Sequence, residues 1–322
     1  MKNRIIIIGG DPNSINSEII YKVWKRLSQN EKKNIFLLAS FDLIRAQYKK
    51  LGSKINLIKV KDINESHPFN CLKIVDIPLN FKDPFKVPIK NSSKYIENSL
   101  NLGHKFGLNK KTKGIINCPI NKQLLKNSKK IGVTEFFASK CKIYNGSEVM
   151  MIHNKKLSVV PLTTHINIKD VPKHIKSDLI IRKVKVLEKN FRKLFKKKPK
   201  IGILGLNPHN AEFDKNSEEI SSIIPSILKL KRNGINISGP LSADTTFVNN
   251  YKTYNVIIGM YHDQVLTPFK TLFHFDAINI TLGLDYVRVS PDHGPAVDLI
   301  GSNKGNYLSL FRCIKFLQNL NK

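Results

Sequence analysis

Three histidines of this 322-residue chain stand behind strand-like segments in equivalent positions. His165 follows the run S-V-V-P-L-T-T, His209 follows I-G-I-L-G-L-N-P, and His262 follows V-I-I-G-M-Y. The carboxyl ends of parallel strands meet at one edge of a sheet, where open α/β folds bind ligands, so we expect the three imidazoles to gather there. Three histidines with open coordination positions form a ligand set for a divalent metal ion. The sequence therefore predicts a metal site.

Each histidine also has a simpler explanation, in which it caps a turn or hydrogen-bonds a loop carbonyl. No local metal signature such as H-E-x-x-H is present, so the metal prediction depends on the expected topology. Asp170, Asp244 and Asp263 lie near the histidines along the chain. We take Asp244 and Asp263 as the candidate catalytic residues, which would orient the site or relay a proton.

Two cations and an amide recur at intervals of nine residues in the last third of the chain. Lys270, Asn279 and Arg288 each follow or end a strand-like segment. Together they offer two positive charges and an amide to a phosphate monoester. The competing interpretation is that Lys270 and Arg288 are ordinary solvated cations.

Motifs for several other chemistries are absent. Neither G-x-G-x-x-G nor G-x-x-x-x-G-K-[ST] occurs, so no Rossmann nucleotide site and no Walker loop is indicated. No G-x-S-x-G occurs, and Cys118, between a strand and Pro119, is expected to be packed rather than reactive. The residues alone therefore predict neither a dinucleotide site nor a covalent nucleophile.

Segments rich in β-branched residues alternate with longer segments of helical period, which predicts a mostly parallel sheet flanked by helices. The expected strands are Arg4–Ile8, Asn34–Ala39, Lys113–Asn117, Leu157–Leu162, Lys200–Leu206, Asn255–Met260 and Ala277–Leu282. The stretch from Ile63 to Pro88 contains four prolines and little periodicity, so we expect irregular surface structure there.

Two helices are best defined by their apolar spacing. The first has Ser177 as N-cap, and its expected buried residues are Ile180, Val184, Leu187, Phe191 and Leu194. The second runs from about Ser217 to Arg232, with a bend at Pro225 and an end at Gly234. Its expected inward residues are Ile220, Ile223, Ile224, Ile227 and Leu228.

Composition excludes several classes of protein. The formal charge is +30, but 41% hydrophobic residues can form a core, which excludes a disordered basic tail. The lysines are spread along the chain without aromatic interleaving, so we expect anionic substrates and no nucleic acid. No apolar run of ~18 residues occurs, so no membrane partner is expected. The four scattered cysteines and the lack of a signal peptide predict a reduced, cytoplasmic protein.

An ordered set of short motifs extends over nearly the whole chain. The set comprises T-T-H ending at His165, N-P-H ending at His209, G-P-L-S-A-D-T at 239–245, Y-H-D-Q at 261–264, N-I-T-L-G-L at 279–284 and D-H-G at 292–294, with weaker matches at 10–12, 118–122 and 134–136. Together they resemble the 4-hydroxythreonine-4-phosphate dehydrogenase family of pyridoxal phosphate biosynthesis. Each motif is weak alone, whereas the ordered set is highly specific.

The resemblance implies a two-lobed α/β/α fold, isocitrate/isopropylmalate dehydrogenase-like, that binds NAD or NADP without a Rossmann fingerprint. It implies oxidation of 4-phosphooxy-L-threonine to 2-amino-3-oxo-4-phosphooxybutanoate, which decarboxylates to 3-amino-2-oxopropyl phosphate. It assigns one divalent ion per site, zinc, magnesium or cobalt, to His165, His209 and His262. The substrate contacts are Thr134, Lys270, Asn279 and Arg288, and the cofactor candidates are Asp11, Asp292 and His293.

The resemblance also implies an assembly and a division into domains. The expected assembly is a homodimer with a shared active site, in which one histidine comes from the neighbouring subunit. The expected outer domain comprises residues 1–128 plus about 285–322. The central domain, about 129–284, is expected to carry the metal histidines and the dimer interface.

The chain departs from the family pattern at three places. Val133 replaces the histidine of His-Thr-Glu, Ser14 and Asn16 stand where relatives carry glycines, and N-A-E-F-D at 210–214 replaces a glycine-rich turn. Because glycine permits positive φ and close backbone approach, we expect reshaped substrate or cofactor loops. The alternative function is therefore a related dehydrogenase acting on 4-phosphothreonate or 4-phosphoerythronate.

Overall fold

The computed structural model describes residues 3–64, 68, 70–128, 132–144 and 146–320. The chain divides into two compact units: unit 1 comprises Met1–Lys142 and Leu284–Lys322, and unit 2 comprises Ile143–Gly283. Helix α5 (Val133–Lys140), which follows the boundary expected near residue 128, is part of unit 1 in this division. Thr134 and Arg288 thus belong to unit 1, and the three histidines belong to unit 2.

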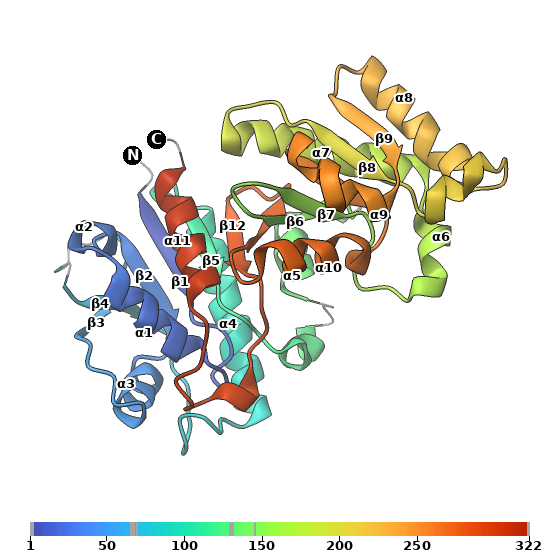
Figure 1. The fold of residues 1–322 in the computed structure, drawn as a ribbon. Helices are drawn as coiled ribbons and strands as arrows, with labels where there is room; N and C mark the ends of the chain where they lie inside the picture. The colour runs from blue at the N-terminus through green and yellow to red at the C-terminus, as the bar shows by residue number, and fades with distance from the viewer. Residues whose placement is uncertain (1–2, 65–67, 69, 129–131, 145, 321–322) are drawn as a thin grey trace. The chain divides into compact units, whose positions relative to one another are not determined.

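Unit 1 is built on parallel strands in the order β3-β4-β2-β1-β5-β12 (Figure 1). The strands are β1 (Arg4–Ile8), β2 (Ile35–Ala39), β3 (Leu57–Val60), β4 (Leu72–Asp76), β5 (Thr112–Asn117) and β12 (Arg288–Pro291). Residues 5–8 and 35–39 are all 2% exposed or less. Strands covered on both faces need apolar residues at every position, which explains these continuous hydrophobic runs.

Helices cover both faces of this sheet. They are α1 (Asn16–Arg26), α2 (Gln29–Lys32), α3 (Phe41–Lys50), α4 (Ile89–Gly107), α5 and α11 (Leu308–Asn319). A Cβ on Gly103 of α4 would clash with Ile8, and a Cβ on Gly114 of β5 would clash with Leu317 of α11. Ile5, which pairs with Gly114, and Ile8 point to opposite faces because strand side chains alternate. The two glycines therefore allow α4 and α11 to approach the sheet from opposite sides.

Strand β4 shows that the predicted irregular stretch from Ile63 to Pro88 is wrong in part. Leu72, Lys73 and Ile74 are each 1% exposed or less, and β4 pairs with β2 and β3. The Lys73 ammonium donates to the carbonyls of Lys32 and Lys33 at 3.2 and 3.1 Å, so a charged residue is satisfied inside the sheet. Residues 65–67 and 69 of this stretch lie outside the described residues.

Unit 2 is built on strands in the order β11-β6-β7-β10-β8-β9. The strands are β6 (Val149–His153), β7 (Ser158–Pro161), β8 (Ile201–Leu204), β9 (Ile237–Leu241), β10 (Val256–Gly259) and β11 (Ile278–Leu282). Strand β6 is antiparallel to β11 and β7, whereas β7, β10, β8 and β9 run parallel. The expected parallel arrangement of the three histidine-bearing strands is therefore confirmed, and β10 lies between β7 and β8.

The helices of unit 2 are α6 (Val171–His174), α7 (Ser177–Phe195), α8 (Ile224–Arg232), α9 (Ala243–Thr245) and α10 (His262–Phe273) (Figure 1). Helix α7 matches its prediction closely, because residues 180, 184, 187 and 191 are buried, although Leu194 is half-exposed. Its N-cap is Lys176, and the Ser177 hydroxyl accepts a hydrogen bond from Ser226 Oγ at 2.9 Å. Within the described ranges, no helix has both the length and the apolarity needed to cross a bilayer.

The predicted helix at 217–232 begins with a π-helical turn at Glu219–Ile223 and continues as α8, with Pro225 in its first turn. Its inward face is rotated relative to the prediction. Leu228 is 50% exposed, while Leu230 and the polar Glu219 are fully buried. The rotation follows from the hydrogen bonds that Glu219 accepts inside the unit, which an apolar pattern alone does not reveal.

Candidate active site

The carboxyl ends of β7, β10 and β8 bring two of the three predicted histidines together. His165 lies in the exposed loop after β7, and His262 is the first residue of α10, the helix that follows β10. Their ring centroids are 5.9 Å apart. A Zn–N bond of ~2.1 Å places each ring centroid about 3.2 Å from the ion, so this spacing fits two imidazoles bound to one metal ion.

Asp263 determines which nitrogen of His262 is available. Its Oδ1 lies 2.6 Å from His262 Nδ1. When Nδ1–H is donated to the carboxylate, the Nε2 lone pair is left for a ligand, as in carboxylate–histidine–metal arrangements. Asp263 thus orients a candidate ligand.

His209 does not join this pair in the single chain. Its side chain is 71% exposed, and Nδ1 lies 3.4 Å from Glu212 Oε1. Residues 209–213 all have positive φ although none is glycine, so the chain adopts here, without glycine, the left-handed backbone that glycine favours. Across the described part of the chain, no three His, Cys, Asp or Glu side chains are close enough to hold a metal ion.

The other predicted residues of unit 2 are dispersed over three elements. Asp244 is exposed in α9, and its Oδ1 accepts the Thr245 N–H at 2.8 Å. Lys270 is exposed on α10, two turns after His262. Asn279 lies in β11, and its Oδ1 is buried without a hydrogen-bond partner among the described residues. A buried amide oxygen of this kind can accept a hydrogen bond from a ligand.

In unit 1, the structure brings Arg288 and Thr134 together and adds Asn117. Arg288 is 2% exposed; its Nε donates to Asn117 Oδ1 at 2.6 Å and its Nη1 to Thr134 Oγ1 at 3.2 Å. Burial lowers the pKa of the guanidinium to about 10, with the Phe137 ring 5.8 Å away. A buried cation held by an amide and a hydroxyl suits an anionic group such as phosphate.

Asn117 is a residue that the sequence analysis did not identify. It is the last residue of β5 and stands directly before the motif C-P-I-N-K at 118–122. Its position at the carboxyl end of a strand is the signal that could have indicated it. Cys118, next to it, is fully buried, and burial raises the pKa of its thiol to about 12, which confirms that it is packed.

Asp11 serves the first loop rather than facing open space. It is 5% exposed, and its two oxygens accept the N–H groups of Asn13 and Asn121 at 2.9 and 3.3 Å. Burial raises the pKa of this carboxyl, and the two N–H donors oppose the rise. Ser14 Oγ donates to the Asp11 carbonyl at 2.6 Å and Asn16 Nδ2 to the Pro119 carbonyl at 2.9 Å. The residues that replace glycines therefore add hydrogen bonds to the loop.

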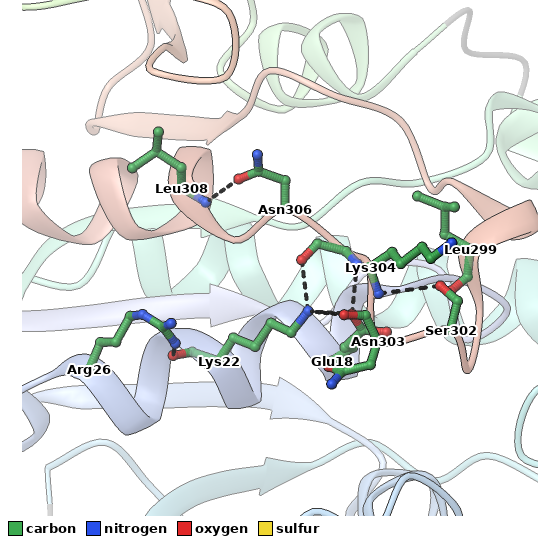
Figure 2. A network of polar contacts seen from close by, with 10 residues as sticks. Glu18, Lys22, Arg26, Leu299, Ser302, Asn303, Lys304, Asn306 and Leu308 are labelled. Atoms are coloured by element: carbon green, nitrogen blue, oxygen red, sulfur yellow. Dashed lines mark hydrogen bonds and ion pairs between the residues drawn. The ribbon is translucent and has the colours of Figure 1, made fainter.

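Asp292 and His293 are half-buried and precede a loop anchored on α1. Figure 2 shows the anchor, in which the Lys22 ammonium donates to Glu18 and to the carbonyls of Asn303 and Gly305. The Gly305 N–H donates to Glu18 Oε1 at 2.8 Å. A cavity of about 840 Å³ beside this network is lined by residues 18, 21, 85, 297, 300 and 303, among others. This part of unit 1 has room for a ligand of cofactor size.

Comparison with known proteins gives one consistent family. The family model of the pyridoxal phosphate biosynthetic protein PdxA matches residues 31–317. The 4-hydroxythreonine-4-phosphate dehydrogenase of Sulfurihydrogenibium sp. is 38% identical over 310 residues, which cover 93% of this chain and 92% of the relative. The enzyme of the same name from Aquifex aeolicus is 36% identical over 325 residues, or 99% of both chains.

Solved structures agree with the sequence relationship. The 4-hydroxythreonine-4-phosphate dehydrogenase of Klebsiella pneumoniae has a TM-score of 0.85 at 25% identity, covering 99% of this chain and 98% of the other. A terephthalate 1,2-cis-dihydrodiol dehydrogenase from Burkholderia xenovorans, with a TM-score of 0.66 at 20% identity over 98% and 97% of the chains, shares the fold. The resemblance and the α/β fold class are thus confirmed. The chain belongs to the PdxA family of pyridoxal phosphate biosynthetic proteins.

Proposed function

We propose that this chain is an NAD- or NADP-dependent oxidoreductase that oxidises 4-phosphooxy-L-threonine to 2-amino-3-oxo-4-phosphooxybutanoate. The product is a β-keto acid, which loses carbon dioxide to give 3-amino-2-oxopropyl phosphate. Family membership over nearly the whole chain carries this proposal, since the relatives that cover it are named 4-hydroxythreonine-4-phosphate dehydrogenases. The buried Arg288 supports a phosphorylated substrate.

Four residues are proposed to contact the substrate. Arg288 and Thr134, already hydrogen-bonded to each other, supply a cation and a hydroxyl. Lys270 supplies a second cation, and Asn279 supplies an amide whose buried oxygen has no hydrogen-bond partner among the described residues. These groups match the charge and the hydrogen-bonding capacity of a phosphate monoester.

One divalent ion, zinc, magnesium or cobalt, is proposed to bind His165, His209 and His262. The spacing of the His165 and His262 rings and the contact between Asp263 and His262 fit such an ion. When bound, the ion would act as a Lewis acid toward the substrate hydroxyl and the enolate left by decarboxylation. Asp263 orients His262, and Asp244 is the remaining candidate for accepting the proton.

The nicotinamide cofactor is proposed to contact Asp292 and His293. Asp11 would act indirectly, because both of its oxygens hold the first loop. We further propose that the protein functions in the cytoplasm as a homodimer. His209 would complete the metal site of the neighbouring subunit, since one chain pairs only His165 with His262 among the described residues.

Subunit mixing tests the shared site. If His209 and His262 serve one site from different chains, a heterodimer of His209→Ala and His262→Ala subunits keeps one intact site. Random reassortment should then restore about a quarter of wild-type activity, because half of the dimers are mixed and half of their sites are whole. A monomer by light scattering would refute the dimer. A dimer that shows no complementation would refute only the assignment of His209 to the neighbouring subunit.

A second candidate function follows from Val133. This residue begins α5 next to Thr134, where the family carries a histidine, so an imidazole is lacking beside the proposed phosphate contact. A substrate such as 4-phosphothreonate or 4-phosphoerythronate, which has no amino group, is the alternative.

Initial rates of NADH or NADPH formation distinguish the two functions. Purified protein is assayed with 4-phosphooxy-L-threonine, 4-phosphothreonate and 4-phosphoerythronate, each with NAD and with NADP. Protein dialysed against a chelator is assayed again after addition of zinc, magnesium or cobalt. The proposal expects the highest kcat/KM for 4-phosphooxy-L-threonine and a metal requirement. Preference for a phosphosugar acid would support the alternative, and full activity without metal would reject the metal site.

A further inference from the structure

Gln264 bridges the carboxyl ends of two neighbouring strands in unit 2. It lies in the first turn of α10, two residues after His262. Its Oε1 accepts the Met260 N–H at 2.7 Å, just past β10, and its Nε2 donates to the Gly205 carbonyl at 2.8 Å, just past β8. A side chain that bridges a backbone N–H and a backbone C=O must carry both a donor and an acceptor, and an amide provides both.

Thr163 extends this bridge to the loop after β7. The Met260 carbonyl accepts the Thr163 N–H at 3.1 Å and the Thr163 hydroxyl at 2.7 Å. Both polar groups of the Met260 backbone are therefore held, the N–H by Gln264 and the carbonyl by Thr163. Thr163 stands two residues before His165, so the loops of His165 and His262 are fixed to each other.

Glu219 extends the bridge to the loop of His209. This carboxylate is fully buried and accepts the N–H groups of Leu206 and Asn207 at 2.7 and 2.9 Å. Asn207 Nδ2 donates to Glu219 Oε2 at 2.9 Å. Asn207 stands two residues before His209 and two after Gly205, so the hydrogen bonds connect all three histidine-bearing loops.

Two glycines leave the space that these side chains occupy. A Cβ on Gly259 would lie 2.5 Å from Val265 Cγ1 and 3.0 Å from Gln264 Oε1. A Cβ on Gly205 would lie 3.0 Å from Glu219 Oε1 and clash with Asn210 Oδ1. The close packing of Gln264 and Glu219 against the strand ends therefore depends on residues without side chains.

We propose that Gln264 is a positioning residue that holds the loops of His165 and His262 at the spacing needed to bind the divalent ion, and holds the loop of His209 in the place from which it would serve the ion of the neighbouring subunit. This inference rests on the proposed metal function of the histidines. Gln264 acts through the backbone of Met260 and Gly205 and need not touch the ion. Without the bridge, the start of α10 and the end of β8 lose the two hydrogen bonds that this amide makes. A site loosened by about 1 Å binds its ligand poorly.

Titration with Co²⁺ tests the proposal independently of turnover. Metal-free wild type, Gln264→Met and Gln264→Glu are titrated against a chromogenic chelator, and the visible absorption of bound Co²⁺ reports its coordination. We expect Gln264→Met to raise the Kd for Co²⁺ roughly 10- to 100-fold and to change the spectrum. Gln264→Glu should not restore binding, because its carboxylate faces the Gly205 carbonyl without a donor.

Gln47→Met is the matched control for lost stability. Gln47 is 3% exposed in unit 1 and donates to the carbonyls of Pro12 and Pro84 at 2.8 and 2.7 Å. The Gln47→Met variant should have a lower Tm than the wild type and the same Kd for Co²⁺.

Should Gln264→Met fail to fold, Thr163→Val provides a milder test, because it removes the hydroxyl bond to Met260 and keeps the N–H bond. We expect Thr163→Val to raise the Kd for Co²⁺ less than Gln264→Met does.

The outcomes separate this inference from the function on which it rests. If the wild type binds no Co²⁺, the proposed metal site is wrong and the inference fails with it. The second outcome is that the wild type binds Co²⁺ and the Gln264 and Thr163 variants have the same Kd and spectrum as the wild type. If these variants also lose stability as Gln47→Met does, the role of Gln264 is merely structural. The metal site would then stand without it.

Discussion

Replacing Arg288 by methionine separates the value of its charge for the reaction from its effect on stability. The guanidinium is 2% exposed, and burial lowers its pKa from the ordinary 12.5 to about 10. At 1.36 kcal/mol per pKa unit, holding the buried charge costs the folded chain about 3 kcal/mol. Methionine removes this cost but deprives Asn117 and Thr134 of a partner, which costs roughly 1–3 kcal/mol. The two effects oppose each other, so we expect the free energy of unfolding to stay within about 2 kcal/mol of wild type.

The effect on catalysis should depend on the phosphate of the substrate, whereas the effect on stability should not. A charge-assisted hydrogen bond to phosphate contributes about 1.5–3 kcal/mol. Its loss should lower kcat/KM for 4-phosphooxy-L-threonine roughly 10- to 150-fold, at about 1.4 kcal/mol per tenfold. The dephosphorylated analogue, 4-hydroxy-L-threonine, offers no phosphate and should lose little.

Urea unfolding and initial rates of cofactor reduction with both substrates measure the two effects. Arg4→Met is the matched control. Arg4 also donates to an asparagine, Asn34 Oδ1 at 2.8 Å, but it lies at the amino end of β1. It should leave the ratio of kcat/KM between the two substrates unchanged. Equal losses on both substrates for Arg288→Met would show that the cation is structural, and the phosphate assignment would have to be abandoned.

Three further predictions concern other parts of the chain. His209→Ala should weaken metal binding and turnover together without lowering Tm, since the side chain is 71% exposed; unchanged metal content and rate would remove it from the ligand set. Burial lowers the pKa of Lys73 from 10.5 to about 8, so the unfolded chain binds more protons than the folded chain between these pH values. As the pH rises through this range, the free energy of unfolding of the wild type should therefore increase by up to about 3 kcal/mol relative to that of Lys73→Met. Urea unfolding at pH 7 and 10 measures this difference, and a constant difference contradicts the prediction. Ala211→Gly should stabilise the chain by about 0.5–1 kcal/mol, because alanine is strained at φ 52° and glycine is not, although glycine gives the unfolded chain more entropy. A fall in Tm would show that the left-handed backbone of Ala211 is not strained.

The fold could be predicted for most strands that contain a run of β-branched or other apolar residues. Strands β1, β2, β5, β7, β8, β10 and β11 were all expected close to their observed bounds. Three of the strands missed by the sequence analysis contain residues that usually signal exposure or a break: Lys73 in β4, Gly239 and Pro240 in β9, and Arg288 in β12. Lys73 and Arg288 are buried because carbonyls of residues 32 and 33 and the Asn117 amide satisfy them. Such partners are distant in sequence, so a local pattern cannot reveal them.

The candidate site could be predicted as far as topology determines it. Strand order places His165, His209 and His262 behind adjacent parallel strands, as expected from their positions. Loop conformation then decides which side chains meet. The backbone is left-handed from His209 to Phe213, and among the described residues His209 does not form a ligand group with the other two histidines. Gln264 carries no catalytic signature in the sequence. Its importance follows only from the two backbone groups that it contacts.

Transfer of deuterium from the substrate to the cofactor tests the central proposal most directly. 4-Phosphooxy-L-threonine labelled with deuterium at C3, the carbon that carries the hydroxyl, is turned over by purified protein with NAD or NADP and a divalent ion. Mass spectrometry of the reduced cofactor should find one deuterium for each carbon dioxide released. Reduced cofactor without deuterium, or no reduction with this substrate when a phosphosugar acid is oxidised, would contradict the proposed reaction.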